Sequence, residues 1–210
     1  MAEEPMFNPD NVGVGKGNPS GYAWVAPKGT TLPTDAKAAL GEEFKGLGYV
    51  SEAGLVNSQE SDSTDLKDWA GRVVKKSQNS FAETYQVEFM ESKADVMRVV
   101  YGDANVEDDG HGGVSVKHNG NFTEERVYVF ETLVSDTIIK RDVIPRGSIL
   151  EKDDVEATSE DALVYPVTIS ALPDEEGNTS YTYFYDSSKA AAASYASAPA
   201  AGSDSETYGE

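Results

Sequence analysis

The sequence predicts a mainly β protein, an antiparallel β-sandwich or β-barrel with one or two short flanking helices. Residues 81–90 and 163–172 alternate apolar and polar side chains with a period of two, which is typical of a half-buried strand. Residues 127–134 carry apolar side chains on both faces, which favours burial on two sides. Strands and helices do not alternate along the chain, so we expect antiparallel pairing.

The first elements are a short strand and an amphipathic helix. A strand is predicted over residues 22–26. A helix is predicted over residues 34–46, because Leu40, Phe44 and Leu47 follow the spacing i, i+4, i+7.

Two further strands are predicted at residues 49–56 and 69–76. Residues 57–68 between them are rich in Ser, Asp, Gln and Glu and predict a long loop. Connections of that length are usually functional or disordered.

A second helix is predicted between Ser92 and Tyr101, ending at Gly102. The segment 92–95 has the form of a capping box, in which Ser92 and Asp95 satisfy backbone donors of the first turn.

The second half of the chain is predicted to be rich in strands. Residues 103–113 are acidic and rich in glycine and therefore predict a loop. The predicted strands are 114–117 and 126–134, pairing as one hairpin or meander, and then 138–143, 163–172 and 181–185, with turns at 145–147 and 174–178.

Composition excludes several classes of function. The chain has 210 residues, of which 17 are Lys or Arg and 37 are Asp or Glu, and its formal net charge is −20. This charge repels nucleic acid and anionic membranes, so we expect neither a DNA-binding module nor a membrane partner. The absence of cysteine excludes disulfides and thiolate metal sites. The first ten residues lack a signal-peptide pattern, so we expect a soluble protein.

Three regions are predicted along the chain. Residues 1–20, rich in Gly and Pro, form an N-terminal arm that needs another surface to become ordered. Residues 21–186 form the β domain. Residues 187–210 are mostly Ala, Ser and Gly and predict a flexible C-terminal tail.

The search for catalytic and ligand-binding motifs yields nothing specific. His111 and His118 are the only histidines and are best explained as exposed polar residues. Residues 105–116 fit a calcium loop poorly, because the twelfth position is valine. Residues 13–17 lack the flanking strand and helix of a phosphate loop. The acidic segment 151–161 is best explained as a solvated face. We therefore expect no enzyme, no cofactor and no metal.

Four stretches in the first half occur in an order that is found in a known family. They are GYAWVAPKGT at 21–30, LPTD at 32–35, FKGLGYVSEAGL at 44–55 and DLKDWAG at 65–71. With a looser likeness through residues 81–102, they make the chain resemble the siphophage major tail proteins, which are tail tube proteins.

The resemblance implies a β domain of the tail-tube type, six copies of which close into a ring. Rings stack into a hollow tube for DNA, with tape measure, tail tip and tail terminator proteins as partners, in a virion tail assembled in the bacterial cytoplasm. Contacts between subunits are implied for the long loop, at Val56, Ser58, Asp65, Leu66, Lys67, Asp68 and Trp69, and for the arm, at Phe7, Val12 and Val14.

Two alternatives remain open at this point. A β-sandwich binding module, such as a capsid decoration or adhesin-like domain, has the same size and fold class. A glycosidase with paired carboxylates is compatible with the many acidic residues, although no pair stands out. If acidic side chains line the bore of a tube, they repel the phosphates of passing DNA.

Overall fold

The computed structural model describes residues 7, 12–19, 21–121 and 124–189. Within them, nine strands form one antiparallel sheet, which confirms the predicted fold class. The order across the sheet is β3-β2-β8-β9-β10-β5-β4; β1 also pairs with β8, and β11 with β9. The strands are β1 Lys16–Gly17, β2 Ala23–Pro27, β3 Lys45–Gly46, β4 Val50–Lys67, β5 Val73–Phe89, β8 Glu125–Leu133, β9 Ile138–Lys152, β10 Tyr165–Ala171 and β11 Tyr181–Asp186.

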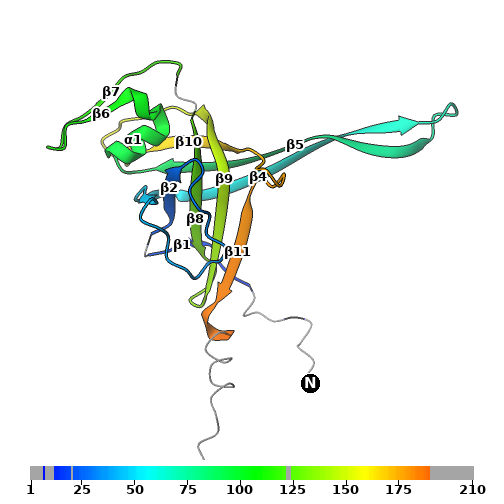
Figure 1. The fold of residues 1–210 in the computed structure, drawn as a ribbon, viewed down its shortest axis with the longest axis horizontal. Coiled ribbons are helices and arrows are strands. Elements are labelled where there is room, and N and C mark those ends of the chain that lie inside the picture. Colours follow the sequence, from blue (N-terminus) through cyan, green and yellow to red (C-terminus); the bar gives the residue numbers. More distant parts are fainter. Residues whose placement is uncertain (1–6, 8–11, 20, 122–123, 190–210) are drawn as a thin grey trace, which may run out of the picture.

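The sheet curls around the core. The ring of Tyr85 in β5 stacks on that of Phe130 in β8, with centroids 6.3 Å apart, although β9 and β10 separate the two strands in the sheet. Tyr85, Val87 and Phe89 are buried while Gln86 is exposed, as the alternation over 81–90 predicted, but Phe81, expected on the same buried face, is exposed because it lies beyond the core. Figure 1 shows this body with the β4–β5 hairpin projecting from it.

Most of the second half follows its sequence pattern. β8, β10 and β11 lie where strands were predicted, and residues 127–131 are all buried. The turn at 174–178 is present, with the Asp174 carboxylate accepting the backbone N–H groups of Glu176 and Asn178.

The predicted turn at residues 145–147 is wrong, because β9 runs through it. The β8–β9 register shifts between Arg126 and Tyr128, which leaves Pro145 within an irregularity of the ladder. On its other side, β9 pairs with β11 up to Val143 and with β10 from Gly147. Proline is tolerated in a strand at such a bulge, because no ladder partner requires its missing N–H.

The predicted helix over residues 34–46 is wrong. The Asp35 carboxylate accepts the N–H groups of Lys37 and Ala38, which forms a single turn. The Asp35 carbonyl then accepts a hydrogen bond from Arg141 Nη1 at 2.8 Å in place of a helical N–H. Residues 45–46 pair with β2 as β3, and Leu47 is fully buried.

Helix α1, Ala94–Tyr101, is present as predicted and ends at Gly102, whose φ of 90° favours glycine. Val96, Val99 and Val100 are buried against the sheet. The predicted capping box is wrong, because α1 has no side-chain cap. The hydroxyl of Ser92 instead shares a hydrogen bond of 2.8 Å with the Tyr165 hydroxyl, which ties the start of the helix to β10.

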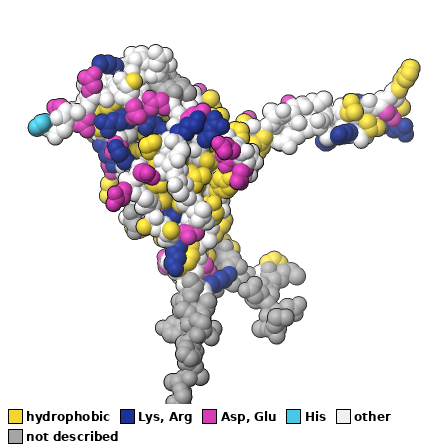
Figure 2. Space-filling model, in the orientation of Figure 1, with side chains coloured by type: hydrophobic (Ala, Val, Ile, Leu, Met, Phe, Trp, Pro, Cys, Tyr) yellow, Lys and Arg dark blue, Asp and Glu magenta, His cyan; other side chains and the backbone are white. Residues whose placement is uncertain are grey.

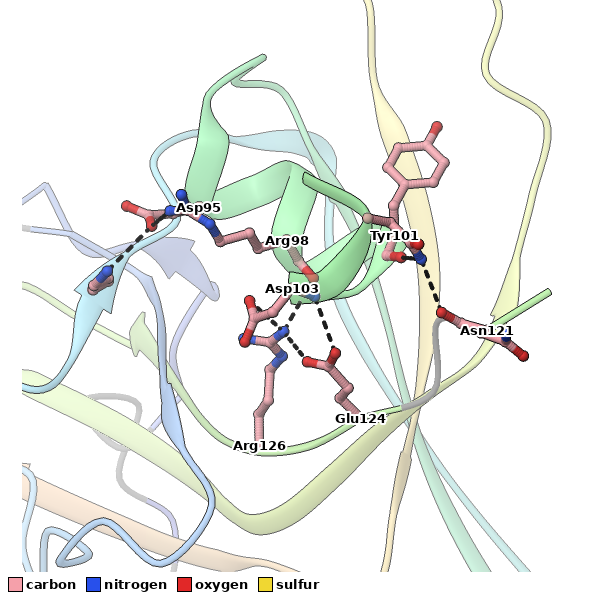
Figure 3. Close-up of polar contacts among 9 residues, drawn as sticks. Asp95, Arg98, Tyr101, Asp103, Asn121, Glu124 and Arg126 are labelled. Carbon is pink, nitrogen blue, oxygen red and sulfur yellow. Dashed lines mark hydrogen bonds and ion pairs between the residues drawn. The ribbon is translucent and has the colours of Figure 1, made fainter. Parts of the chain in front are cut away.

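Arg126 of β8 fixes the end of α1 (Figure 3). Its Nη2 donates to the carbonyl oxygen of Arg98 at 3.2 Å and lies 2.9 Å from the Asp103 carboxylate. Glu124 accepts the backbone N–H of Asp103 at 3.1 Å and pairs with Arg126. A cation beside the last helical carbonyls is electrostatically favourable.

The predicted loop over residues 103–113 and the predicted pairing of residues 114–117 are both wrong. The short 3-10 helix η2, Asp103–Asn105, and strand β6, Val106–Asp108, lie within that loop. β6 pairs with β7, Val114–Val116, in a separate two-stranded sheet. The Asp109 carboxylate accepts the N–H groups of His111 and Gly113, which closes the turn locally and makes pairing with β8 unnecessary.

The division into arm, domain and tail stays a prediction. β1 lies within the predicted arm and pairs with Leu133 and Thr132 of β8. Residues 190–210 of the predicted tail lie outside the described residues.

Candidate assembly surface

The most prominent surface feature is the hairpin of β4 and β5. The two strands pair from Val50 and Phe89 to Lys67 and Val73. Between residues 59 and 82 nearly every side chain is exposed, so about 30 Å of two-stranded ribbon has no contact with the core. This ribbon projects from the body in Figure 1. The predicted loop over 57–68 is therefore wrong in its secondary structure. An isolated hairpin is marginally stable in water, and this one requires further contacts to become rigid.

The hairpin ends in a tight turn that presents Trp69 to solvent. The Asp68 carboxylate accepts hydrogen bonds from the backbone N–H and the Nε of Arg72, both at 2.8 Å. These bonds, led by the one from the Arg72 backbone, lower the pKa of Asp68. Gly71 has φ of 80°, which closes the turn without strain. Trp69, at the apex, is fully exposed.

Exposed apolar side chains gather along the distal hairpin. Single exposed apolar residues are ordinary, but a cluster of them marks an interaction site. Figure 2 shows hydrophobic and basic side chains together at the projecting end. The exposed apolar residues of this region are Leu66, Trp69, Val73, Val74 and Phe81.

A buried carboxylate anchors the base of the hairpin. Glu83 of β5 is 2% exposed and accepts hydrogen bonds from Asn57 Nδ2 at 2.8 Å and Gln59 Nε2 at 3.0 Å, both in β4. The hydroxyls of Thr179 and Ser180, just before β11, also donate to it. Burial by itself raises the pKa of Glu83, but these hydrogen bonds outweigh it and leave the pKa below its ordinary value.

Glu83→Gln is expected to lower the free energy of unfolding at pH 7 by about 1–3 kcal/mol, because a neutral amide cannot accept all of these hydrogen bonds. A lowered pKa in the folded state stabilises the protein above the ordinary glutamate pKa, and this contribution is lost as the pH falls through the folded-state value. Denaturant unfolding from pH 7 to pH 3 should therefore show a smaller loss of stability in the variant. Parallel pH curves for the two proteins would contradict this role.

The described residues do not bring ligating side chains together in a candidate metal centre. No group of three or more His, Asp or Glu that could hold a metal occurs in the described part of the chain. His118 packs edge-on against the ring of Tyr101, at 4.7 Å between centroids. Asn105 is the first residue of segment 105–116, which fits a calcium loop poorly. Its Nδ2 donates to the carbonyl oxygens of Tyr101 and Asn121.

A family model of phage tail tube proteins matches residues 7–196. The chain belongs to the phage tail tube protein family. This match spans the whole β domain, including the hairpin, and it confirms the resemblance seen in the sequence. The tail tube protein is thus a structural component of a phage tail.

Similarity to individual proteins is weaker. One solved structure, the sheath-tube complex of the PVC extracellular contractile injection system in its extended state, contains a similar chain at 10% identity. The match covers 80% of this chain and 90% of that one, with a TM-score of 0.35. No curated protein matches the chain. The family assignment therefore depends on the family model.

The structure places most of the predicted contact residues on the hairpin. Val56, Ser58, Asp65, Leu66 and Lys67 lie on β4, and Asp68 and Trp69 in the turn. Phe7, Val12 and Val14 of the predicted arm are exposed. Their contacts with other subunits stay a prediction. Val73, Val74 and Phe81 on β5 are also exposed but were not among the predicted contact residues, because the return strand was not recognised as part of the projection. In the described part of the tail tube protein, no helix has the length and apolar character needed to cross a membrane.

Proposed function

We propose that this tail tube protein forms six-membered rings that stack into the hollow tube of a siphophage tail, through which DNA passes. The observation that carries the proposal is the β4–β5 hairpin, whose exposed apolar side chains have no core in one copy to cover them. A second copy supplies the missing surface. The protein acts by assembly and without catalysis.

The sheet supports ring closure through its edges. β4 and β3 end the strand order, so each leaves backbone N–H and C=O groups available for pairing. Pairing of one edge with a different edge on the next copy is a heterologous contact, and such contacts close into rings when the rotation permits. Ring closure removes the exposed edges.

The net charge of −20 suits a conduit for DNA. Carboxylates facing a bore repel phosphates and allow DNA to pass without adhering. Tape measure, tail tip and tail terminator proteins are the further partners of this proposal, and assembly occurs in the bacterial cytoplasm before release of the virion.

Negative-stain electron microscopy of the purified chain over a concentration series, with its solution mass, tests the proposal. We expect hollow tubes or rings, and a mass that rises with concentration towards six copies. A chain that stays monomeric even with preformed tail tips present would contradict it. A stable trimer would instead favour the capsid decoration alternative.

A further inference from the structure

The distal hairpin differs in charge from the rest of the chain. Between residues 65 and 76 four side chains are basic and two are acidic, in a chain of net charge −20. Lys76 pairs loosely with Asp65 at 3.8 Å, and Arg72 pairs with Asp68. Lys67 and Lys75 form no ion pair with any described residue. The projecting end therefore combines apolar side chains with uncompensated positive charge.

The segment between β9 and β10 has the opposite character. Residues 151–161 carry six carboxylates and one lysine. None of these six carboxylates forms an ion pair within the described chain. Within residues 150–163, three apolar side chains are exposed, Leu150 at 60%, Val155 at 43% and Leu163 at 37%. It matches the hairpin end in its mixture of apolar and charged groups, with the charge reversed.

One copy cannot bring these two surfaces together. The acidic segment contains Lys152, whose Nζ lies 4.9 Å from the centre of the Tyr101 ring in α1. Figure 1 shows α1 and the free end of the hairpin on opposite sides of the body. A contact between the two surfaces must therefore be intermolecular, and it joins two different surfaces, as a ring or a stack requires.

We propose that the distal hairpin, residues 65–76, docks on the acidic segment 150–163 of a second copy. The inference rests on the proposed assembly and names the two surfaces that meet in it. Trp69, Leu66 and Val74 cover exposed apolar side chains of the acceptor, and Lys67 and Lys75 face its carboxylates. Opposite charges steer the encounter and fix its register, and the contact weakens as salt rises.

Cross-linking tests the contact directly, since the chain has no cysteine. Ala70→Cys in the turn and Ala157→Cys in the acidic segment place single exposed thiols on the two surfaces. Two such proteins are mixed and treated with a flexible bis-maleimide, and covalent heterodimers are expected. Replacing the second protein with an Asp136→Cys variant, in the exposed turn after β8, should reduce the yield about tenfold. Equal yields would overturn the proposal.

Charge exchange provides the second test. Lys67→Glu with Lys75→Glu, or Asp154→Lys with Glu156→Lys, should each reduce heterodimer yield and assembly about tenfold. Combining all four substitutions in one chain should restore both. Glu175→Lys with Glu176→Lys makes the same charge change as Asp154→Lys with Glu156→Lys, in another exposed turn, and should have no effect. No rescue by the combined variant would overturn the proposal.

These experiments distinguish failure of the docking proposal from failure of the proposed tube assembly. Tubes without heterodimers would remove the docking surface and leave the tube function standing. Heterodimers from a chain that never forms rings or tubes would support the docking and contradict the ring assembly.

Discussion

Replacing Arg141 with leucine is expected to lower the free energy of unfolding by about 3–5 kcal/mol. Arg141 in β9 lies opposite Glu131 in β8, and both are almost fully buried, at 4% and 8% exposure. Arg141 Nε donates to Glu131 Oε1 at 2.8 Å, and Asn18 Nδ2 donates to Glu131 Oε2 at 2.7 Å. Loss of the guanidinium leaves a buried carboxylate without its cation. It also frees the Asp35 carbonyl that Arg141 binds.

Chemical denaturation at pH 7 measures this loss. Lys28→Leu is the matched control, since Lys28 pairs with Glu125 at 2.7 Å but is 56% exposed. The control should cost less than about 1 kcal/mol. Glu131→Leu combined with Arg141→Leu should cost less than Arg141→Leu alone, because the unpaired charge is removed. If Arg141→Leu alone lowered the free energy of unfolding no more than Lys28→Leu does, the Arg141–Glu131 pair would contribute little to stability.

The buried half of the fold was predictable from periodicity. Tyr85, Val87 and Phe89 alternate with more accessible neighbours because one face of β5 packs on the core, and Val167 and Ile169 are buried as the period of two predicted. The position of α1 was predictable from its three valines and Gly102. In these segments local pattern and tertiary burial agree.

The errors arise where tertiary contacts decide the backbone. Arg141 lies 106 residues from Asp35, and no local signal shows that it takes the carbonyl of the predicted helix. Pro145 predicts a turn by itself, but a bulge in the ladder accommodates it. Such long-range pairings leave no pattern in a single sequence.

The sequence predicted which part of the chain holds the candidate assembly surface, but not that this part forms a β-hairpin. Its residues were assigned through the resemblance, and their contacts with other subunits stay a prediction. Strand alternation is absent from residues 59–67, because in one copy neither face of the distal ribbon is buried. A strand without a buried face carries no period of two, so the segment looks like a polar loop. Trp69 was the one clear signal, as a large aromatic side chain among polar residues.

Shortening the hairpin is expected to abolish tube formation while leaving the body folded. Deleting residues 62–67 and 73–80 closes the ladder at Ser61 and Phe81 with the native turn of residues 68–72. No buried residue of the described core lies in the deleted stretches, and the hydrogen bonds to Glu83 remain. The melting temperature should therefore change by less than about 5 °C. The pelleted tube fraction should fall below detection, because the apolar end no longer reaches another copy.

A point variant in the same region distinguishes the effect of hairpin length from the effect of the exposed apolar side chain. Trp69→Ser keeps the full length of the hairpin and removes the largest exposed apolar side chain, for which a hot-spot loss of about 2 kcal/mol or more is expected in the contact between copies. Assembly should then begin only at a protein concentration about thirtyfold higher, since each 1.4 kcal/mol changes the equilibrium constant tenfold. Tubes formed by the shortened protein at the original concentration would contradict the assignment, because the contacts that hold the rings would then lie wholly on the body.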